Sequence, residues 1–193
     1  MNKIIKVILS VLIICVLTQF SLALDQDWFQ FAREEIQMGQ WWRFLSANFV
    51  HLSWQHLGMN VLGLVLIYAF FPRVLSWNAW VIVLLLCSLS VTFGIWLFNP
   101  NIVWYVGLSG ALHGLLVILL VLDYVRHKSR LNILLLIAIF AKLIWEILKG
   151  PMPGSEGIAG GPVVVQAHLY GFIGAILMLS FLYIINIKKK LMK

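Results

Sequence analysis

The feature that most restricts the fold of this chain is a series of six apolar runs, each long enough to cross a lipid bilayer. A helix needs about 20 apolar residues to span a hydrocarbon core of ~30 Å. The predicted spans cover 4–24, 51–71, 77–98, 107–125, 131–148 and 163–187. Together they occupy most of the 193 residues. The sequence therefore predicts an all-α polytopic membrane protein, a six-helix bundle that forms one domain over 1–193.

The composition excludes several classes of protein. Apolar residues make up 62% of the chain and charged residues 11%, whereas a soluble domain is about one quarter charged. A soluble domain of this length could not bury so much apolar surface, which excludes a cytosolic enzyme, a disordered chain and a nucleic-acid binder. Cys15 and Cys87 both lie in apolar runs, so we expect no disulfide framework, no metal site and no cofactor.

The basic residues predict the orientation, because Lys and Arg gather on the cytoplasmic side of a membrane. With the amino terminus inside, the inner segments hold Lys3, Lys6, Arg73, Arg126, Lys128, Arg130, Lys188, Lys189, Lys190 and Lys193. The outer segments hold only Arg33, Arg43 and Lys149. We therefore expect both termini in the cytoplasm. We interpret the net charge of +7 as membrane topology rather than as nucleic-acid binding.

The first run permits two interpretations. Lys3 and Lys6, an apolar stretch and then Ser-Leu-Ala at 21–23 are typical of a cleaved secretory signal. The run is longer than a usual signal core, which favours an uncleaved span. The following segment, 25–50, alternates aromatic and charged residues, so we predict an amphipathic outer loop with aromatic side chains at the depth of the lipid headgroups.

Polar side chains inside the spans carry the main functional signal, because each is costly in lipid. The second, fourth and sixth spans all run inward from the outer face in the predicted topology, so the residues that open them share one depth. The polar residues at these openings are His51, His56, Asn60, Ser109, His113 and His168. Three helices are therefore expected to bring imidazole, hydroxyl and amide groups into one layer.

Ser109 and His168 have the chemistry of a nucleophile and its base. Gly110 and Gly114 follow Ser109 as a small-xxx-small pair, and small residues also flank His168, so the two helices could pack until the side chains hydrogen-bond. The imidazole could then take the serine proton as the oxygen attacks a carbonyl carbon. Taken alone, each residue is more simply explained by packing. Their common depth favours catalysis.

The remaining polar groups leave alternatives open. His56 and Asn60 share a helical face and could either donate hydrogen bonds to an oxyanion or hold helices together. Glu146 is the only acid in the outer half of a span, and its i, i+4 spacing from Lys142 predicts an intrahelical ion pair that either stabilises the helix or gates the site. We therefore predict a Ser–His dyad rather than a triad.

His113 could itself be proposed as the base, because it lies one turn after Ser109. At 1.5 Å per residue it lies ~6 Å deeper than Ser109, which weakens that interpretation. We assign the proton to His168. His113 is expected to support the ring of His168 by stacking or by a hydrogen bond.

These residues together resemble the rhomboid family of intramembrane serine proteases. The matching motifs are Gly107-Leu108-Ser109-Gly110, Ala167-His168-Leu169-Tyr170-Gly171, His56-Leu57-Gly58-Met59-Asn60 and Trp42-Arg43. The resemblance implies a rhomboid-like bundle in which Ser109 is the nucleophile, His168 is the general base, and His56, Asn60 and the Ser109 backbone amide form the oxyanion hole. It implies structural roles for Trp42, Arg43, Gly107, Gly110, Gly114 and Gly171.

One departure from the family pattern is informative. Many rhomboids have a tyrosine where this chain has His113, and the sequence around it is similar to the rhombosortase branch. Those bacterial enzymes process secreted proteins that end in a GlyGly motif, a transmembrane helix and a basic tail. The resemblance thus implies cleavage of such tails near the periplasmic face of the inner membrane.

A rival interpretation is a non-catalytic rhomboid-like protein that binds transmembrane helices through the same thin surfaces. The presence of both Ser109 and His168 argues against it. A transporter is a weaker rival, because the spans contain a single charge pair and no repeated, broken helices.

Overall fold

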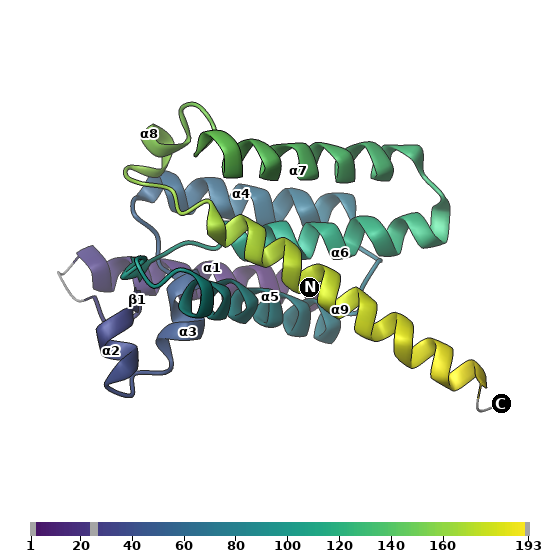
Figure 1. Ribbon diagram of the computed structural model, residues 1–193, viewed down its shortest axis with the longest axis horizontal. Helices are drawn as coiled ribbons and strands as arrows, with labels where there is room; N and C mark the ends of the chain where they lie inside the picture. The colour runs from purple at the N-terminus through teal and green to yellow at the C-terminus, as the bar shows by residue number, and fades with distance from the viewer. Residues whose placement is uncertain (1–2, 24–26, 192–193) are drawn as a thin grey trace.

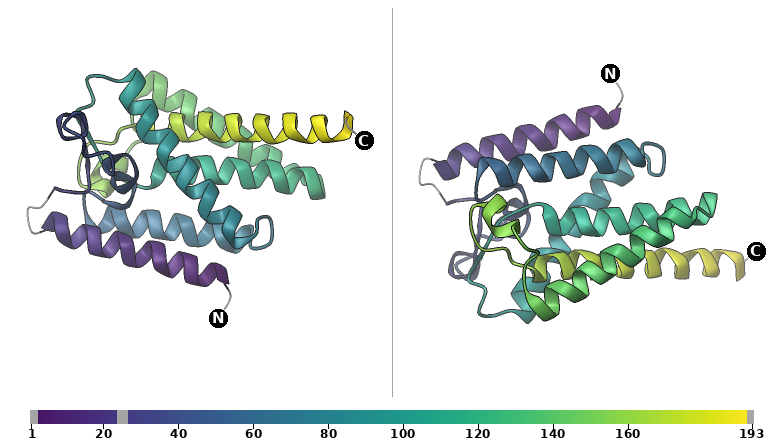
Figure 2. Two further views of the ribbon diagram at one scale, coloured as in Figure 1. Left: turned by 90° about the horizontal axis from the view of Figure 1, so that it is seen from below. Right: turned by 90° about the horizontal axis from the view of Figure 1, so that it is seen from above.

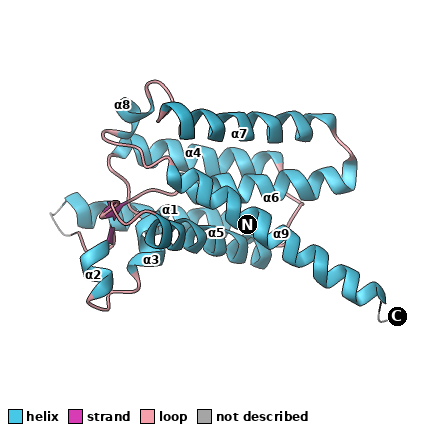
Figure 3. Cartoon of the chain, viewed as in Figure 1, coloured by secondary structure: helices cyan, strands magenta, loops and turns pink. Residues whose placement is uncertain are grey.

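The computed structural model describes residues 3–23 and 27–191 as a bundle of long helices (Figures 1 and 3). The long helices are α1 (Lys3–Ala23), α4 (Trp54–Phe70), α5 (Trp77–Phe98), α6 (Ser109–His127), α7 (Arg130–Lys149) and α9 (Gln166–Leu191). One helix therefore forms at each predicted span. The predicted end of the first span at residue 24 and the start of the loop at residue 25 lie outside the described residues.

Four of these helices are long and apolar enough to cross a membrane, namely α5, α6, α7 and the part of α9 up to Ile184. A fifth span is counted if the bent pair Arg43–Phe49 and Trp54–Phe70 is treated as one. In α1 the apolar part that the structure describes in full is shorter, at Ile8–Phe20. The chain is therefore a multi-pass membrane protein, and the number six stays a prediction.

Helix α6 lies at the centre of the bundle, where it contacts α4, α5, α7 and α9. Its buried side chains, among them Leu115, Leu119 and Leu120, are almost wholly enclosed. The outer helices instead expose large apolar side chains, as α7 does with Ile137, Phe140 and others. A soluble protein would bury most of these side chains. In a membrane they can stay exposed, because lipid tails are as apolar as they are.

The chain bends by 92° immediately before α4, a feature that the predicted span 51–71 did not include. The helix begins only at Trp54, because the Ser53 hydroxyl accepts a hydrogen bond from the His56 backbone N–H at 3.1 Å and caps the helix. His51 precedes the helix and is fully buried.

Helix α1 pairs the backbone groups that this bend leaves open. The Thr18 hydroxyl donates to the Phe49 carbonyl at 2.7 Å, and the Gln19 side-chain oxygen accepts from the His51 N–H at 3.2 Å. Non-helical backbone at membrane depth persists only where protein groups satisfy it. The polar residues of α1 therefore explain how the bend is tolerated.

The short elements gather at one end of the bundle, which we call the loop end: β1 (Phe31–Ala32), α2 (Arg33–Gln37), α3 (Arg43–Ser46), η1 (Ala47–Phe49), β2 (Trp104–Tyr105) and α8 (Ser155–Ala159). The start of α1 and the end of α9 lie at the opposite end (Figure 2). Strands β1 and β2 pair antiparallel, with Phe31 opposite Tyr105. The predicted amphipathic loop is thus a compact structure built of short helices.

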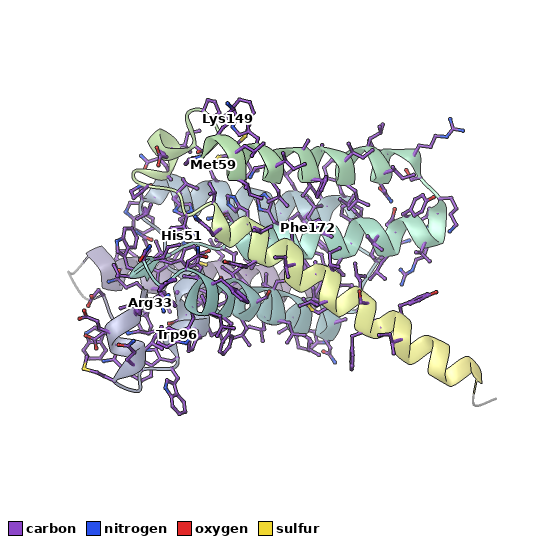
Figure 4. All side chains as sticks on the ribbon, viewed as in Figure 1. Arg33, His51, Met59, Trp96, Lys149 and Phe172 are labelled. Atoms are coloured by element: carbon purple, nitrogen blue, oxygen red, sulfur yellow. The ribbon has the colours of Figure 1, made fainter. Side chains whose placement is uncertain are left out.

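Arg33 fastens this structure to the end of α5. Its guanidinium donates to the carbonyls of Ile95, Trp96, Asn99 and Ile102 at 3.0–3.2 Å. The same group lies over the Trp96 ring, 4.8 Å from the ring centroid (Figure 4). The last carbonyls of a helix have no partner within it, so this one cation both satisfies and neutralises that helix end.

Candidate active site

Glycines bring α6 and α9 into backbone contact. A Cβ atom on Gly110 would lie 2.6 Å from the Ala167 carbonyl oxygen, and one on Gly114 would lie 2.5 Å from that of Gly171. A Cβ on Gly171 would overlap the Gly110 carbonyl. The structure therefore has the close approach that the small residues of both helices led us to expect.

This approach places Ser109 beside His168. Ser109 is the first residue of α6, and His168 lies in the first turn of α9. The serine Oγ lies 2.9 Å from the histidine Nε2, which is within the range for a nucleophile and its base. His168 is buried, so most of its ring is shielded from the surroundings of the protein.

A carboxylate also reaches His168. Glu146, near the end of α7, places its Oε2 2.9 Å from Nδ1 of the histidine and its Oε1 2.6 Å from the Lys142 Nζ. The intrahelical ion pair predicted from the sequence is present. The inference that no acid stands beside His168 was wrong, because α7 turns this residue toward α9 rather than toward lipid.

His113 packs against the face of the His168 ring. The His113 and His168 rings stack with centroids 4.3 Å apart and planes 25° apart. The His113 Nδ1 lies 2.7 Å from the Ser109 carbonyl oxygen, so Nδ1 carries the hydrogen and donates it. The Ser109 Oγ contacts the His168 Nε2, whereas His113 contacts the His168 ring and the Ser109 carbonyl.

Ser109 opens into a cavity at the loop end. Its walls are formed by Leu52, His56, Trp104, Tyr105, Val106, Ser109, Pro162, Val163 and Val164. These residues come from the start of α4, from the β2 segment, from the start of α6 and from the segment before α9. A ligand in this cavity would therefore contact four separate segments of the chain.

His56 lines this cavity and carries a hydrogen-bond donor on its ring. Its Nδ1 accepts from the Leu52 backbone N–H at 3.4 Å, which leaves the hydrogen on Nε2. Gly107 makes room for the ring: its φ is +122°, and a Cβ atom there would lie 2.8 Å from the His56 Cε1. Only glycine suits both conditions. The neighbouring Tyr105 hydroxyl donates to the Gly107 carbonyl and fixes this turn.

Asn60 lies one turn below His56 and is buried. Its side-chain nitrogen has no hydrogen-bond partner within the described part of the chain. An unpaired buried donor is rare in a native protein. The Asn60 side-chain nitrogen is therefore free to donate a hydrogen bond to a bound ligand. His51 packs edge-on against His56, with centroids 5.0 Å apart, so its position is that of a packing residue.

Trp42 and Arg43 lie at the loop end, in the segment that supports the cavity. Arg43 is 3% exposed and donates to the carbonyls of Asp27 and Gln30 at 2.6 and 2.8 Å. Trp42 is half exposed, and its indole N–H donates to the Trp28 carbonyl at 3.1 Å. Both residues therefore organise the backbone of the loop, and neither lines the cavity.

The sequence reasoning missed the cavity walls at 104–106 and 162–164 and the roles of two further residues. The capping role of Ser53 was missed, although Ser immediately before an apolar helix is the usual signal for it. Glu146 was recognised only as a partner of Lys142, although an acid within a span is by default a functional candidate. No cluster of metal-ligating side chains occurs within 3–23 or 27–191.

The comparison with known families agrees with this geometry. The chain matches the rhomboid domain over residues 38–185, a range that includes every residue of the site. No curated protein gives a further match. The matched range covers most of the chain and contains Ser109, His168 and the elements that position them, and on this evidence the chain belongs to the rhomboid family, a family of intramembrane serine proteases.

Proposed function

We propose that the protein is an intramembrane serine endopeptidase in which Ser109 is the nucleophile and His168 is its base. The observation that carries the proposal is the 2.9 Å contact between the Ser109 Oγ and the His168 Nε2, beside a small cavity that Ser109 and His56 line. Serine is a poor nucleophile until a base takes its proton. A hydroxyl held against a buried imidazole inside a membrane protein has this chemistry.

The reaction would proceed by acyl transfer. The Ser109 hydroxyl gives its proton to the His168 Nε2 while Oγ attacks the peptide carbonyl carbon, and the carbonyl oxygen becomes an oxyanion. The protonated His168 then gives its proton to the leaving amine. Water hydrolyses the remaining ester through the same steps in reverse order.

Three donors would stabilise the oxyanion. Ser109 begins α6, so its backbone N–H has no partner within the helix. The Nε2–H of His56 lies at the same cavity, and the Asn60 amide is the unpaired donor one turn below. The helix amino terminus adds a positive partial charge.

We further propose that the substrates are transmembrane proteins with a C-terminal tripartite tail, which consists of a GlyGly motif, an apolar helix and a basic end. This assignment rests on the resemblance of the region around His113 to rhombosortases. A substrate helix must open before its carbonyl can be attacked, because helical carbonyls are hydrogen-bonded. Glycine supports this step, since it costs ~1 kcal/mol per residue in a helix relative to alanine.

The site would lie near the periplasmic face of the bacterial inner membrane, with both termini in the cytoplasm. The distribution of basic residues supports this orientation. The cavity and the loop end would then face outward, where water for the hydrolytic step is available.

Coexpression with a reporter tests the proposal. A secreted reporter with a tripartite tail should lose the tail in cells that contain the wild-type protein and retain it with Ser109→Ala. A second reporter, whose GlyGly is replaced by LeuLeu, should remain uncut. Equal tail removal with wild type and Ser109→Ala would contradict a serine mechanism. Retention of the tail in both strains, together with co-purification of the reporter, would indicate a helix-binding protein instead.

A further inference from the structure

The environment of Glu146 assigns this residue a function beyond its ion pair. Its side chain is 3% exposed, whereas that of Lys142 is 31% exposed. The other buried side chains of α7 are those of Asn132 and Leu143. A carboxylate inside a membrane protein is costly unless it is paired. Its position facing α9 is therefore the feature that needs an explanation.

We propose that Glu146 is the positioning residue of the catalytic histidine, so that Ser109, His168 and Glu146 form a triad in which Lys142 is the counter-ion of the carboxylate. The inference rests on the proposed function, because a triad is meaningful only if Ser109 is a nucleophile. The three groups form a chain of two hydrogen bonds through the His168 ring. The Ser109 Oγ lies 2.9 Å from the His168 Nε2, and the His168 Nδ1 lies 2.9 Å from the Glu146 Oε2.

The carboxylate determines which nitrogen of His168 carries the hydrogen. A carboxylate only accepts hydrogen bonds, so Nδ1 must donate to Glu146 and Nε2 is left with a lone pair toward Ser109. This is the tautomer that can take the serine proton. The negative charge also stabilises the imidazolium that forms as the proton arrives.

Lys142 competes for the same nitrogen. Its Nζ lies 3.3 Å from the His168 Nδ1, and an ammonium group only donates. If Nδ1 accepted from Lys142, the hydrogen would move to Nε2 and point at Ser109, and the base would be lost. Glu146 prevents this arrangement in two ways, because it holds Nδ1 at the shorter distance and draws Lys142 to its other oxygen at 2.6 Å.

This competition gives the substitution Glu146→Gln a specific consequence. Lys142 can donate only to the amide oxygen, which turns the amide NH₂ group toward Nδ1. The NH₂ group is a donor, so it favours the inactive tautomer. Replacing Lys142 as well, in Glu146→Gln with Lys142→Met, frees the amide oxygen to accept from Nδ1–H. The second substitution should therefore restore part of the activity that the first removes.

The test measures the rate at which a fluorophosphonate probe labels Ser109 in the purified full-length protein, together with thermal unfolding in the same detergent. Relative to wild type, Glu146→Gln should label roughly 100-fold more slowly or worse, since loss of a triad acid through the wrong tautomer costs up to about 10⁴-fold in a soluble protease. The double variant should label faster than Glu146→Gln. Glu34→Gln, in the exposed part of α2, is the matched control and should label at the wild-type rate.

The outcomes separate the two proposals. Labelling that is absent in wild type, or unaffected by Ser109→Ala, would refute the proposed function and the triad with it. Labelling that depends on Ser109 but proceeds at the wild-type rate in Glu146→Gln would refute the triad alone. So would a double variant that labels no faster than Glu146→Gln, because a purely structural ion pair predicts no rescue.

A spectroscopic measurement does not depend on the folding of any Glu146 variant. In the wild-type protein with ¹⁵N-labelled histidine, the His168 signal, assigned by its loss in His168→Ala, should show the hydrogen on Nδ1 at neutral pH. A hydrogen on Nε2 would mean that Lys142 rather than Glu146 sets the tautomer, and would overturn the inference.

Discussion

His113 and His168 lie face to face with their ring planes only 25° apart, and His113 is at the same time bonded to the Ser109 carbonyl. One side chain thus contacts both His168 and Ser109. Since a stacked aromatic pair contributes about 0.5–1.5 kcal/mol, its loss should have a measurable but limited effect on rate.

We expect His113→Tyr to retain substantial activity, because a phenol ring can stack on His168 in the same place. His113→Ala should label with the fluorophosphonate probe roughly 3- to 10-fold more slowly, which corresponds to the stacking energy. His168→Tyr should abolish labelling. Robust labelling in His168→Ala, lost in both His113 variants, would reverse the roles of the two histidines.

The contact between α6 and α9 predicts the effect of a single added methyl group. Gly110→Ala would place a Cβ 2.6 Å from the Ala167 carbonyl, so the helices must separate at the site. Overpacking of this kind costs about 1–3 kcal/mol, and it should also slow labelling by moving His168 away from Ser109. Thermal unfolding and labelling check the two effects.

Gly58→Ala is the matched control for this substitution. Gly58 is helical and nothing lies within 4 Å of a Cβ built on it, so alanine there should leave stability unchanged or raise it by up to ~1 kcal/mol. Equal destabilisation by both alanines would mean that the bundle tolerates no added methyl group anywhere, and that the α6–α9 contact is not special.

Asn60→Ala should lower kcat more than it raises KM, because donors to a developing charge act mainly in the transition state. If Asn60 compares with oxyanion donors in soluble enzymes, the substitution should remove roughly 2.7–4 kcal/mol of transition-state stabilisation. The loss will be smaller if His56 compensates. Cleavage kinetics of Asn60→Ala, His56→Ala and the double variant provide the check. An unchanged kcat in the double variant would make both residues packing groups.

The buried cation Arg43 should matter for the loop end rather than for chemistry. Arg43→Lys keeps the charge but not the planar set of donors, in which Nη1 donates to the Asp27 and Gln30 carbonyls and Nε donates to the Gln40 side chain. An unmet buried acceptor costs about 1–3 kcal/mol, so the loop should be cut faster in limited proteolysis. Arg130→Gln, an exposed residue at the start of α7, should be cut at the wild-type rate.

The orientation is tested by reporters fused after residue 193. A reporter that is active only in the cytoplasm should be active there, and one that is active only in the periplasm should be silent. The reverse result would place the basic tail 188–193 outside and would put the cavity on the cytoplasmic face.

Much of the site could be predicted from the sequence because it depends on depth. Residues that open helices running in the same direction lie in the same layer, so Ser109, His168 and His56 could be grouped before their distances were known. The glycines at 110, 114 and 171 identified the two helices that meet, since only small residues allow such contact.

The position of Glu146 could not be predicted in the same way, because the sequence does not say which neighbouring helix its side of α7 contacts. Lys142, Glu146 and Lys149 share one side of the helix by their spacing, but that side could have faced several partners. The spacing from Lys142 described a pair on one helix correctly, yet it contained no information about α9. Only the packing of α7 against α6 and α9 turned the carboxylate to the histidine.

The start of α4 was missed for a different reason. The predicted span began at His51, although only Leu52 is apolar among residues 51–53. The helix instead begins at Trp54, because the hydroxyl of Ser53 caps it there.

That same hydroxyl ties together two parts of the protein that are far apart in sequence. The Ser53 Oγ accepts from the His56 N–H at 3.1 Å and donates to the Ala159 carbonyl of α8 at 2.8 Å. Residues 162–164, which follow α8, form one wall of the cavity. In the proposed enzyme, a substrate that pushed this wall aside would strain the bond to Ala159, and with it the first turn of the helix that carries His56. Admission of the substrate would then be coupled, through one oxygen atom, to the position of the proposed oxyanion donor.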